Sequence, residues 1–261
     1  MVRAQGAGRA QQRARQVLAP VARRLWRIET HGFERLPPDG PAILCPNHIS
    51  FLDSAFLMLT LPRNVSFVGK AEYMDSWKTK FLFPVMGMIP IDRRGGSPAR
   101  AALDTAAVVL RRGELFGIYP EGTRSRDGRL HKGRTGAARL ALDEGVPIYP
   151  VGIVGTDSIQ PPDAKVPRRT GACSITVGRA VRPERYAAAE PHRAYRALID
   201  EVMFEIRELS GQEYVDDYAG SSADAAGESR TTAEPAHLQD APDVVPASDG
   251  TPSRGVQPIT A

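Results

Sequence analysis

The chain has 261 residues, of which 42% are hydrophobic and 25% charged, so it can bury a globular core. Residues 1–210 hold 32 basic and 21 acidic residues, a net charge of +11, whereas residues 211–261 carry −7. The composition excludes collagen-like, coiled-coil and disulfide-rich classes, and the basic part predicts anionic partners. With two cysteines, Cys45 and Cys173, we expect no disulfide framework, no metal site and a reducing compartment.

The N-terminus predicts a basic amphipathic helix. Residues 1–12 are rich in Gly, Ala, Gln and Arg and are expected to be disordered. Residues 13–28 then carry an apolar stripe at three- and four-residue spacing, made of Val17, Val21, Leu25 and Ile28. Among so many arginines, such a helix suits an anionic membrane surface. An equally good interpretation is that it covers the core of its own domain.

No segment is apolar for long enough to predict a membrane-spanning helix. The longest strongly apolar run, residues 81–91, has 11 residues, and a span needs about 20. We therefore expect contact with a membrane from one side only.

The rest of the chain alternates strand and helix patterns. The predicted strands are short apolar segments at residues 42–45, 65–68, 115–119, 146–154 and 174–177. The predicted helices cover residues 51–61, 97–112, 133–144 and 194–209. This alternation predicts one α/β domain over residues 13–210, with a central mixed or parallel sheet flanked by helices. Residues 211–261 have no apolar period and are expected to form a disordered acidic tail that activity does not require.

The first motif with chemical content reads Pro-Asn-His-Ile-Ser-Phe-Leu-Asp over residues 46–53. In one continuous helix His48 and Asp53 would lie about 140° apart. If a strand ends at Pro46 and a helix starts after Ser50, Asp53 can instead reach back to one ring nitrogen of His48 and leave the other free to accept a proton. Both residues could also be purely structural. A histidine near an aspartate often has no catalytic role, and an acid such as Asp53 near a helix start stabilises the helix.

Three further motifs follow. Residues 87–93 read Gly-Met-Ile-Pro-Ile-Asp-Arg, and Arg93 suits a phosphate or is simply exposed. Residues 119–125 read Tyr-Pro-Glu-Gly-Thr-Arg-Ser, which is an ordinary turn or a ligand site at the carboxyl edge of the sheet. Residues 146–151 read Val-Pro-Ile-Tyr-Pro-Val, which predicts either an apolar wall near an acyl chain or an irregular edge strand.

In this order and spacing, the four motifs resemble the signature of the glycerolipid acyltransferases. The resemblance is strongest to bacterial 1-acyl-glycerol-3-phosphate acyltransferases and covers about residues 20–185, with Tyr119 where that family commonly has Phe. It implies the glycerol-phosphate acyltransferase fold. It also implies transfer of an acyl group from acyl-CoA or acyl-carrier protein to 1-acyl-glycerol-3-phosphate (lysophosphatidate), giving phosphatidate without a cofactor.

The resemblance also implies roles for particular residues. His48 would be the general base, Asp53 would orient it, and amides at the helix start after Ser50 would stabilise the oxyanion. The glycerol phosphate would be held by a set of polar and charged groups: Arg93, Glu121, Gly122, Thr123 and Arg124, with Lys70 as a further candidate.

Two alternatives remain open on the sequence. One keeps the chemistry with another lysophospholipid or glycerol phosphate as acceptor, and the other is a non-catalytic binder of anionic membranes. Nucleic acid is not an expected partner, because the chain has no helix-turn-helix pattern and no basic–aromatic RNA-binding strand. The expected location is the cytoplasmic face of the plasma membrane, as a peripheral protein.

Overall fold

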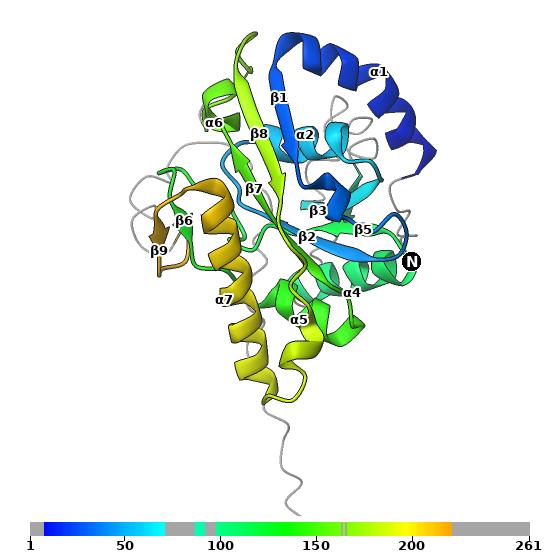
Figure 1. The fold of residues 1–261 in the computed structure, drawn as a ribbon, viewed down its shortest axis with the longest axis vertical. Helices are drawn as coiled ribbons and strands as arrows, with labels where there is room; N and C mark the ends of the chain where they lie inside the picture. Colours follow the sequence, from blue (N-terminus) through cyan, green and yellow to red (C-terminus); the bar gives the residue numbers. More distant parts are fainter. Residues whose placement is uncertain (1–7, 71–86, 92–97, 163, 165, 221–261) are drawn as a thin grey trace, which may run out of the picture.

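The computed structural model describes residues 8–70, 87–91, 98–162, 164 and 166–220. Seven strands of this part form one sheet with helices on both faces (Figure 1). Their order across the sheet is β1 (Arg27–His31), β8 (Ala172–Val177), β7 (Ile148–Val154), β2 (Ala42–Pro46), β5 (Leu115–Gly117), β3 (Val65–Lys70) and β4 (Met88–Ile91). Neighbouring strands are parallel except β7 and β8, which are antiparallel. The predicted α/β architecture with a mixed sheet is confirmed.

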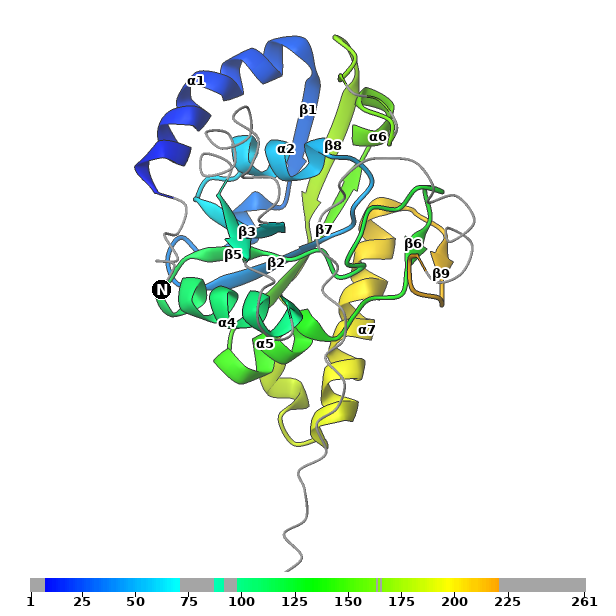
Figure 2. The same cartoon turned by 180° about the vertical axis from the view of Figure 1, so that it is seen from behind.

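The helices form two layers, seen from opposite sides in Figures 1 and 2. One face of the sheet is covered by α1 (Arg9–Leu25), α2 (Leu52–Thr60), the short α6 (Thr156–Ile159) and the 3-10 turn η1 (Phe33–Arg35). The other face is covered by α4 (Pro98–Arg111), α5 (Gly136–Glu144), α7 (Pro191–Ser210) and the turn η3 (Pro183–Tyr186).

Strand β2 shows why the sequence builds two cores. Ala42 and Leu44 pack into the core beneath α1 and α2, while Ile43 and Cys45 pack into the core beneath α4, α5 and α7. All four are fully buried. A strand covered on both faces is apolar at every position, and this accounts for the unbroken apolar run that predicted it.

The N-terminal helix differs from its predicted range of residues 13–28. It begins at Arg9, so the expectation of disorder over residues 1–12 is wrong for residues 9–12, and it ends at Leu25. Trp26 is extended, with φ −128° and ψ 142°. The Trp26 indole donates to the carbonyl of Arg168, and β1 follows in register with β8. Ile28 therefore belongs to a strand. That pairing joins segments about 145 residues apart, so no local pattern reports it. Within the described ranges, no helix is both long and apolar enough to cross a membrane.

The structure corrects the sequence at two further places. β7 lies between β2 and β8, so of the two alternatives for residues 146–151 the edge strand is excluded, and the segment with two prolines is a central strand. The tail prediction fails at its start, because β9 (Tyr214–Val215) pairs in parallel with β6 (Leu130–His131) to form a second, two-stranded sheet. Residues 211–220 are thus part of the fold.

Candidate active site

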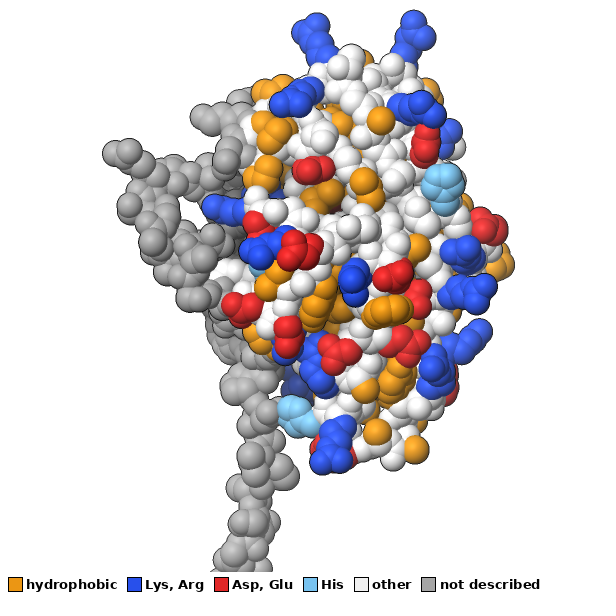
Figure 3. Space-filling view, turned by 60° about the vertical axis from the view of Figure 1, so that its left-hand side comes forward, with side chains coloured by type: hydrophobic (Ala, Val, Ile, Leu, Met, Phe, Trp, Pro, Cys, Tyr) orange, Lys and Arg blue, Asp and Glu red, His pale blue; other side chains and the backbone are white. Residues whose placement is uncertain are grey.

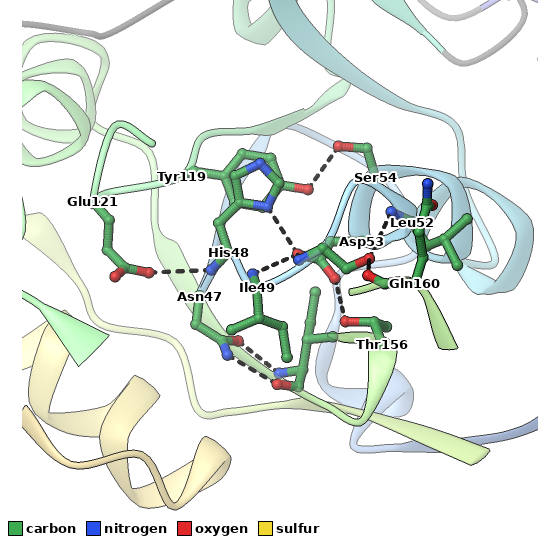
Figure 4. A network of polar contacts seen from close by, with 12 residues as sticks. Asn47, His48, Ile49, Leu52, Asp53, Ser54, Tyr119, Glu121, Thr156 and Gln160 are labelled. Carbon is green, nitrogen blue, oxygen red and sulfur yellow. Dashed lines mark hydrogen bonds and ion pairs between the residues drawn. The ribbon is translucent and has the colours of Figure 1, made fainter. Parts of the chain in front are cut away.

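The candidate site lies where three neighbouring parallel strands end. β2 leads to His48, β5 leads to Tyr119 and Glu121, and β7 leads to Thr156 at the start of α6. Because β2 lies between β5 and β7, the parallel order brings segments from distant parts of the chain to one edge of the sheet (Figure 4). This is the edge at which open α/β sheets bind their ligands.

His48 and Asp53 are in direct contact. Nδ1 of His48 is 2.8 Å from Oδ2 of Asp53, and the two side chains are 7% and 0% exposed. The geometry follows from the local fold, because β2 ends at Pro46 and α2 begins at Leu52, which leaves His48 in the connecting turn. An acceptor on Nδ1 fixes the tautomer with hydrogen on Nδ1 and a basic Nε2.

Asp53 is held by further donors besides His48. Its Oδ2 accepts from the backbone N–H of Ile49 at 2.8 Å and of Ser50 at 2.9 Å. Its Oδ1 accepts from the hydroxyl of Thr156 at 2.5 Å. A fully buried carboxylate needs such donors in place of water. The sequence motif gave no sign of Thr156, which lies 103 residues further along the chain.

The same contacts occupy backbone amides near the start of α2. The amides of Ile49 and Ser50 already donate to Asp53, and the amide of Leu52 donates to the Ser50 hydroxyl at 3.3 Å. These three N–H groups are therefore engaged within the turn itself. The expectation that amides at the helix start after Ser50 stabilise an oxyanion stays a prediction.

Tyr119 packs against the imidazole. Its ring lies nearly parallel to that of His48, with the centroids 3.9 Å apart and the planes at 17°. Its hydroxyl is 2.6 Å from the Ser54 hydroxyl on α2. Burial and the nearby Asp53 raise the pKa of Tyr119 well above its usual value, so the phenol stays neutral. The ring limits the imidazole on one face while the hydrogen bond fixes the ring.

Glu121 is fully buried beside the site and contacts backbone. Its Oε1 accepts from the N–H of His48 at 3.1 Å and its Oε2 accepts from the N–H of His131 at 3.0 Å. Burial raises the pKa of Glu121 to about 8, against the opposing effect of these two donors. The expectation was that Glu121 holds the substrate. The structure instead places its carboxyl between two chain segments, where it positions the turn that carries His48.

The rest of the Glu-Gly-Thr-Arg turn returns to His48. Gly122 has φ +80°, and its amide donates to the Tyr119 carbonyl, so it shapes the turn. Thr123 is buried and Arg124 is half-buried. The next amide, that of Ser125, donates to the His48 carbonyl at 2.7 Å. Arg124 is therefore one residue from a direct backbone contact with His48.

Of the two remaining predicted residues, the structure describes only Lys70, at the same edge of the sheet. Lys70 is the last residue of β3, the strand next to β5. Arg93 lies outside the described residues, just beyond the end of β4 at Ile91. In the part of the chain that the structure describes, no group of three or more His, Cys, Asp or Glu side chains could hold a metal ion.

Comparison with known proteins agrees with this geometry. Residues 27–154 match the family model described as Acyltransferase. Over these residues, which make up just under half of the chain, the protein is similar to the Acyltransferase family. The matched segment contains His48, Asp53 and the turn from Tyr119 to Arg124, whereas Thr156 and everything after it lie outside.

Curated relatives carry one enzymatic name. The chain is 33% identical over 137 residues to the chloroplastic 1-acyl-sn-glycerol-3-phosphate acyltransferase LPAT1 of Arabidopsis thaliana, covering 52% of this chain and 38% of that protein. It is 31% identical over 132 residues to the 1-acyl-sn-glycerol-3-phosphate acyltransferase of Borreliella burgdorferi, covering 51% and 53%. The chain thus spans about half or less of the length of these relatives.

A solved structure shares the fold. The 1-acyl-sn-glycerophosphate acyltransferase PlsC of Thermotoga maritima superposes with a TM-score of 0.57 at 22% identity, over 76% of this chain and 82% of that one. The expectation of this acyltransferase fold is confirmed.

Proposed function

We propose that the protein transfers an acyl group from an acyl thioester to the free hydroxyl of 1-acyl-glycerol-3-phosphate, giving phosphatidate. The observation that carries the proposal is the contact between His48 and Asp53 at the carboxyl edge of the sheet. The names of the relatives support the choice of substrate. The donor is acyl-CoA or acyl-carrier protein, and no cofactor is required.

The contacts suit direct transfer without an acyl-enzyme. Nε2 of His48 takes the proton from the acceptor hydroxyl as its oxygen attacks the thioester carbonyl carbon. Asp53, held on Nδ1, stabilises the imidazolium that forms. The tetrahedral intermediate then collapses, the carbon–sulfur bond breaks, and the leaving thiolate takes the proton back from His48. The substrate supplies the nucleophile, so no serine is needed in the site.

A phosphate on the acceptor suits the basic groups of this edge. Arg124 lies one residue from the backbone contact between Ser125 and His48, and Thr123 precedes it. Lys70 ends the neighbouring β3. We propose that these residues, together with Arg93, hold the phosphate through charge-assisted hydrogen bonds. A glycerol phosphate or another lysophospholipid would present the same group, and the assay below separates these acceptors.

We also propose that α1 lies on an anionic membrane. Two of its polar side chains dock it on the protein. Gln11 is fully buried and pairs with the backbone of Val65 in both directions, at 2.9 and 3.0 Å, and Arg15 donates to the carbonyl of Met58 at 3.0 Å. Its apolar stripe faces outward, with Val17, Val21 and Leu25 exposed by 67%, 54% and 43%. The exposed stripe is therefore available to a lipid surface.

The charged side chains of α1 are distributed differently from those on the side that carries α7. The last turn of α1 holds Arg23 and Arg24, and its first turn has no acid. On the side that carries α7, β6 and β9, Figure 3 shows acidic and basic side chains interspersed. We propose that the α1 side meets the cytoplasmic face of the plasma membrane, as a peripheral contact.

The test is an acyl-transfer assay on the purified full-length chain. Acyl-CoA and acyl-carrier protein serve as donors, and lysophosphatidate, glycerol 3-phosphate and lysophosphatidylcholine as acceptors. We expect turnover with lysophosphatidate and a loss of at least about 100-fold in the His48→Ala variant. Faster turnover with another acceptor would mean that lysophosphatidate is not the substrate, while the proposed chemistry would stand. Turnover that a folded His48→Ala variant retains would refute the mechanism, and absence of turnover with every pair would favour a membrane-binding protein.

A further inference from the structure

Residues 212–219, referred to below as the strap, run back from α7 along the loop that follows the Glu-Gly-Thr-Arg turn. Within the strap β9 pairs with β6, with Tyr214 opposite Leu130 and Val215 opposite His131. Figures 1 and 2 both place β9 beside β6, next to the end of α7. The family match ends at residue 154, so nothing in that match assigns a role to the strap.

Gln212 connects the strap to both sides of the candidate site. Its Oε1 accepts from Nδ2 of Asn47 at 2.7 Å, and its Nε2 donates to the carbonyl of Gly128 at 2.8 Å. Asn47 directly precedes His48 and is fully buried. Gly128 lies in the loop whose first residue, Ser125, donates its amide hydrogen to the His48 carbonyl. One side chain thus joins the turn that carries His48 to the loop that follows Arg124.

Backbone contacts hold the strap along that loop. The amide of Leu130 donates to the carbonyl of Glu213 at 2.8 Å, and the amide of Lys132 donates to the carbonyl of Asp217 at 3.0 Å. The Lys132 ammonium also pairs with Asp216 at 2.9 Å. These contacts lie on both sides of the amide of His131, which donates to Glu121. The carboxyl of Glu121 in turn accepts from His48.

The strap therefore reaches His48 by two routes. The first passes through Gln212 and Asn47, and the second through β6 and Glu121. We propose that the strap is a positioning element for the acyl transfer and that Gln212 is its positioning residue. It fixes His48 relative to Arg124, and so the base relative to the phosphate of the acceptor. The inference rests on the proposed function for the identity of the reaction.

Activity is tested in the full-length chain with Gln212→Ala and Gln212→Glu. Displacement of a reacting group by about 1 Å can cost up to about 100-fold in rate, so we expect Gln212→Ala to lower kcat by about tenfold. Gln212→Glu keeps an acceptor for Asn47 but cannot donate to Gly128, and we expect an intermediate loss. The matched control is Glu213→Ala, since this exposed side chain leaves the backbone contact intact. We expect kcat of the control within about twofold of the parent chain.

A purely structural role predicts a different result. It would lower the amount of folded protein and leave kcat per folded molecule unchanged, so each rate is divided by the folded fraction from a melting curve. Gln212→Ala with the kcat of the Glu213→Ala control would overturn the proposal. A chain cut after Gly220 keeps the whole strap and should match the parent chain, and a tenfold loss there would also overturn it.

Hydrogen exchange tests the strap without reference to activity. We expect Gln212→Ala to speed exchange at the amides of Ser125, Leu130 and Lys132 and to leave α4 unchanged. If the parent chain transfers no acyl group, the proposed function fails while exchange still tests the strap. Unchanged exchange over residues 125–132 would refute the positioning role even if acyl transfer is established.

Discussion

Thr156 donates its hydroxyl hydrogen to Oδ1 of Asp53 at 2.5 Å, while Oδ2 of the same carboxylate holds His48. Thr156 is fully buried at the first position of α6. The chain reaches it through Gly155, where φ is +86° and a Cβ would lie 2.5 Å from the Ala172 carbonyl, so only glycine fits. The end of β7 thereby holds the carboxylate of Asp53 through Oδ1, while the turn of Asp53 itself holds Oδ2.

Removing that hydroxyl should slow the reaction. Thr156→Val keeps the shape and loses the donor, and hydrogen bonds to charged groups contribute about 1.5–3 kcal/mol. We expect kcat to fall about 10- to 100-fold in Thr156→Val and to recover largely in Thr156→Ser, which restores a hydroxyl. The measurement is steady-state turnover with lysophosphatidate. A Thr156→Val variant with parental kcat would show that the three remaining donors suffice for Asp53.

The ring of Tyr119 should matter more than its hydroxyl. Tyr119→Phe keeps the ring stacked on His48 and loses only the bond to Ser54, so we expect kcat within about threefold of the parent. Tyr119→Leu removes the ring, and aromatic pairs contribute about 0.5–1.5 kcal/mol, so we expect a loss of up to about tenfold. Both variants are compared at equal folded fraction. Equal kcat in the Tyr119→Phe and Tyr119→Leu variants would show that the stacked ring does not contribute to the function of His48.

Glu121 should make stability depend on pH. Its pKa is about 8 in the folded chain against 4.5 for the free group. The folded chain keeps this proton after the unfolded chain has lost it. The stability from this group is therefore fully present below about pH 4.5 and is lost as pH rises toward 8.

Denaturant unfolding between pH 5 and 9 tests this sign. Glu121→Gln cannot titrate, so we expect the unfolding free energy of the parent to fall relative to this variant by up to about 1.4 kcal/mol per pH unit, levelling off above pH 8. Glu208→Gln, on the exposed side of α7, is the control and should run parallel to the parent. If the unfolding free energies of the parent and of Glu121→Gln also run parallel over this pH range, the buried carboxyl of Glu121 is ionised throughout.

The sequence could predict what local chain geometry decides. Asp53 follows His48 by five residues across a strand end and a helix start, so the turn alone brings them together. The parallel order of the strands then explains why the Glu-Gly-Thr-Arg turn meets His48. Sequence periodicity also found β2, β5, β7 and α7, because each is apolar on the faces that it buries.

The contacts that the sequence could not predict join residues that lie far apart along the chain. Thr156 reaches Asp53 across 103 residues, and Gln212 reaches Asn47 across 165. Glu121 was expected to bind the substrate because it follows a strand at the edge where open α/β sheets bind ligands. Two backbone N–H groups instead hold its carboxyl inside the fold. β9 has only two residues and pairs with an equally short β6, so neither shows a period that a pattern could detect.

The outward stripe of α1 gives the last prediction. We expect the triple substitution of Val17, Val21 and Leu25 by Ser to weaken binding to phosphatidylglycerol vesicles by about 100-fold or more, since burial of each such side chain contributes about 1.5–3 kcal/mol. The fold should survive, because Gln11 and Arg15 make the polar contacts that dock the helix.

A matched control uses an exposed apolar residue elsewhere. Phe204 on α7 is 55% exposed, and Phe204→Ser should leave vesicle sedimentation unchanged. Because the arginines of α1 add an electrostatic contribution, binding of the parent chain should also weaken as salt screens the surface or as phosphatidylcholine replaces phosphatidylglycerol. A triple variant that sediments with vesicles like its parent would assign the stripe to another partner and leave the membrane contact to a different surface.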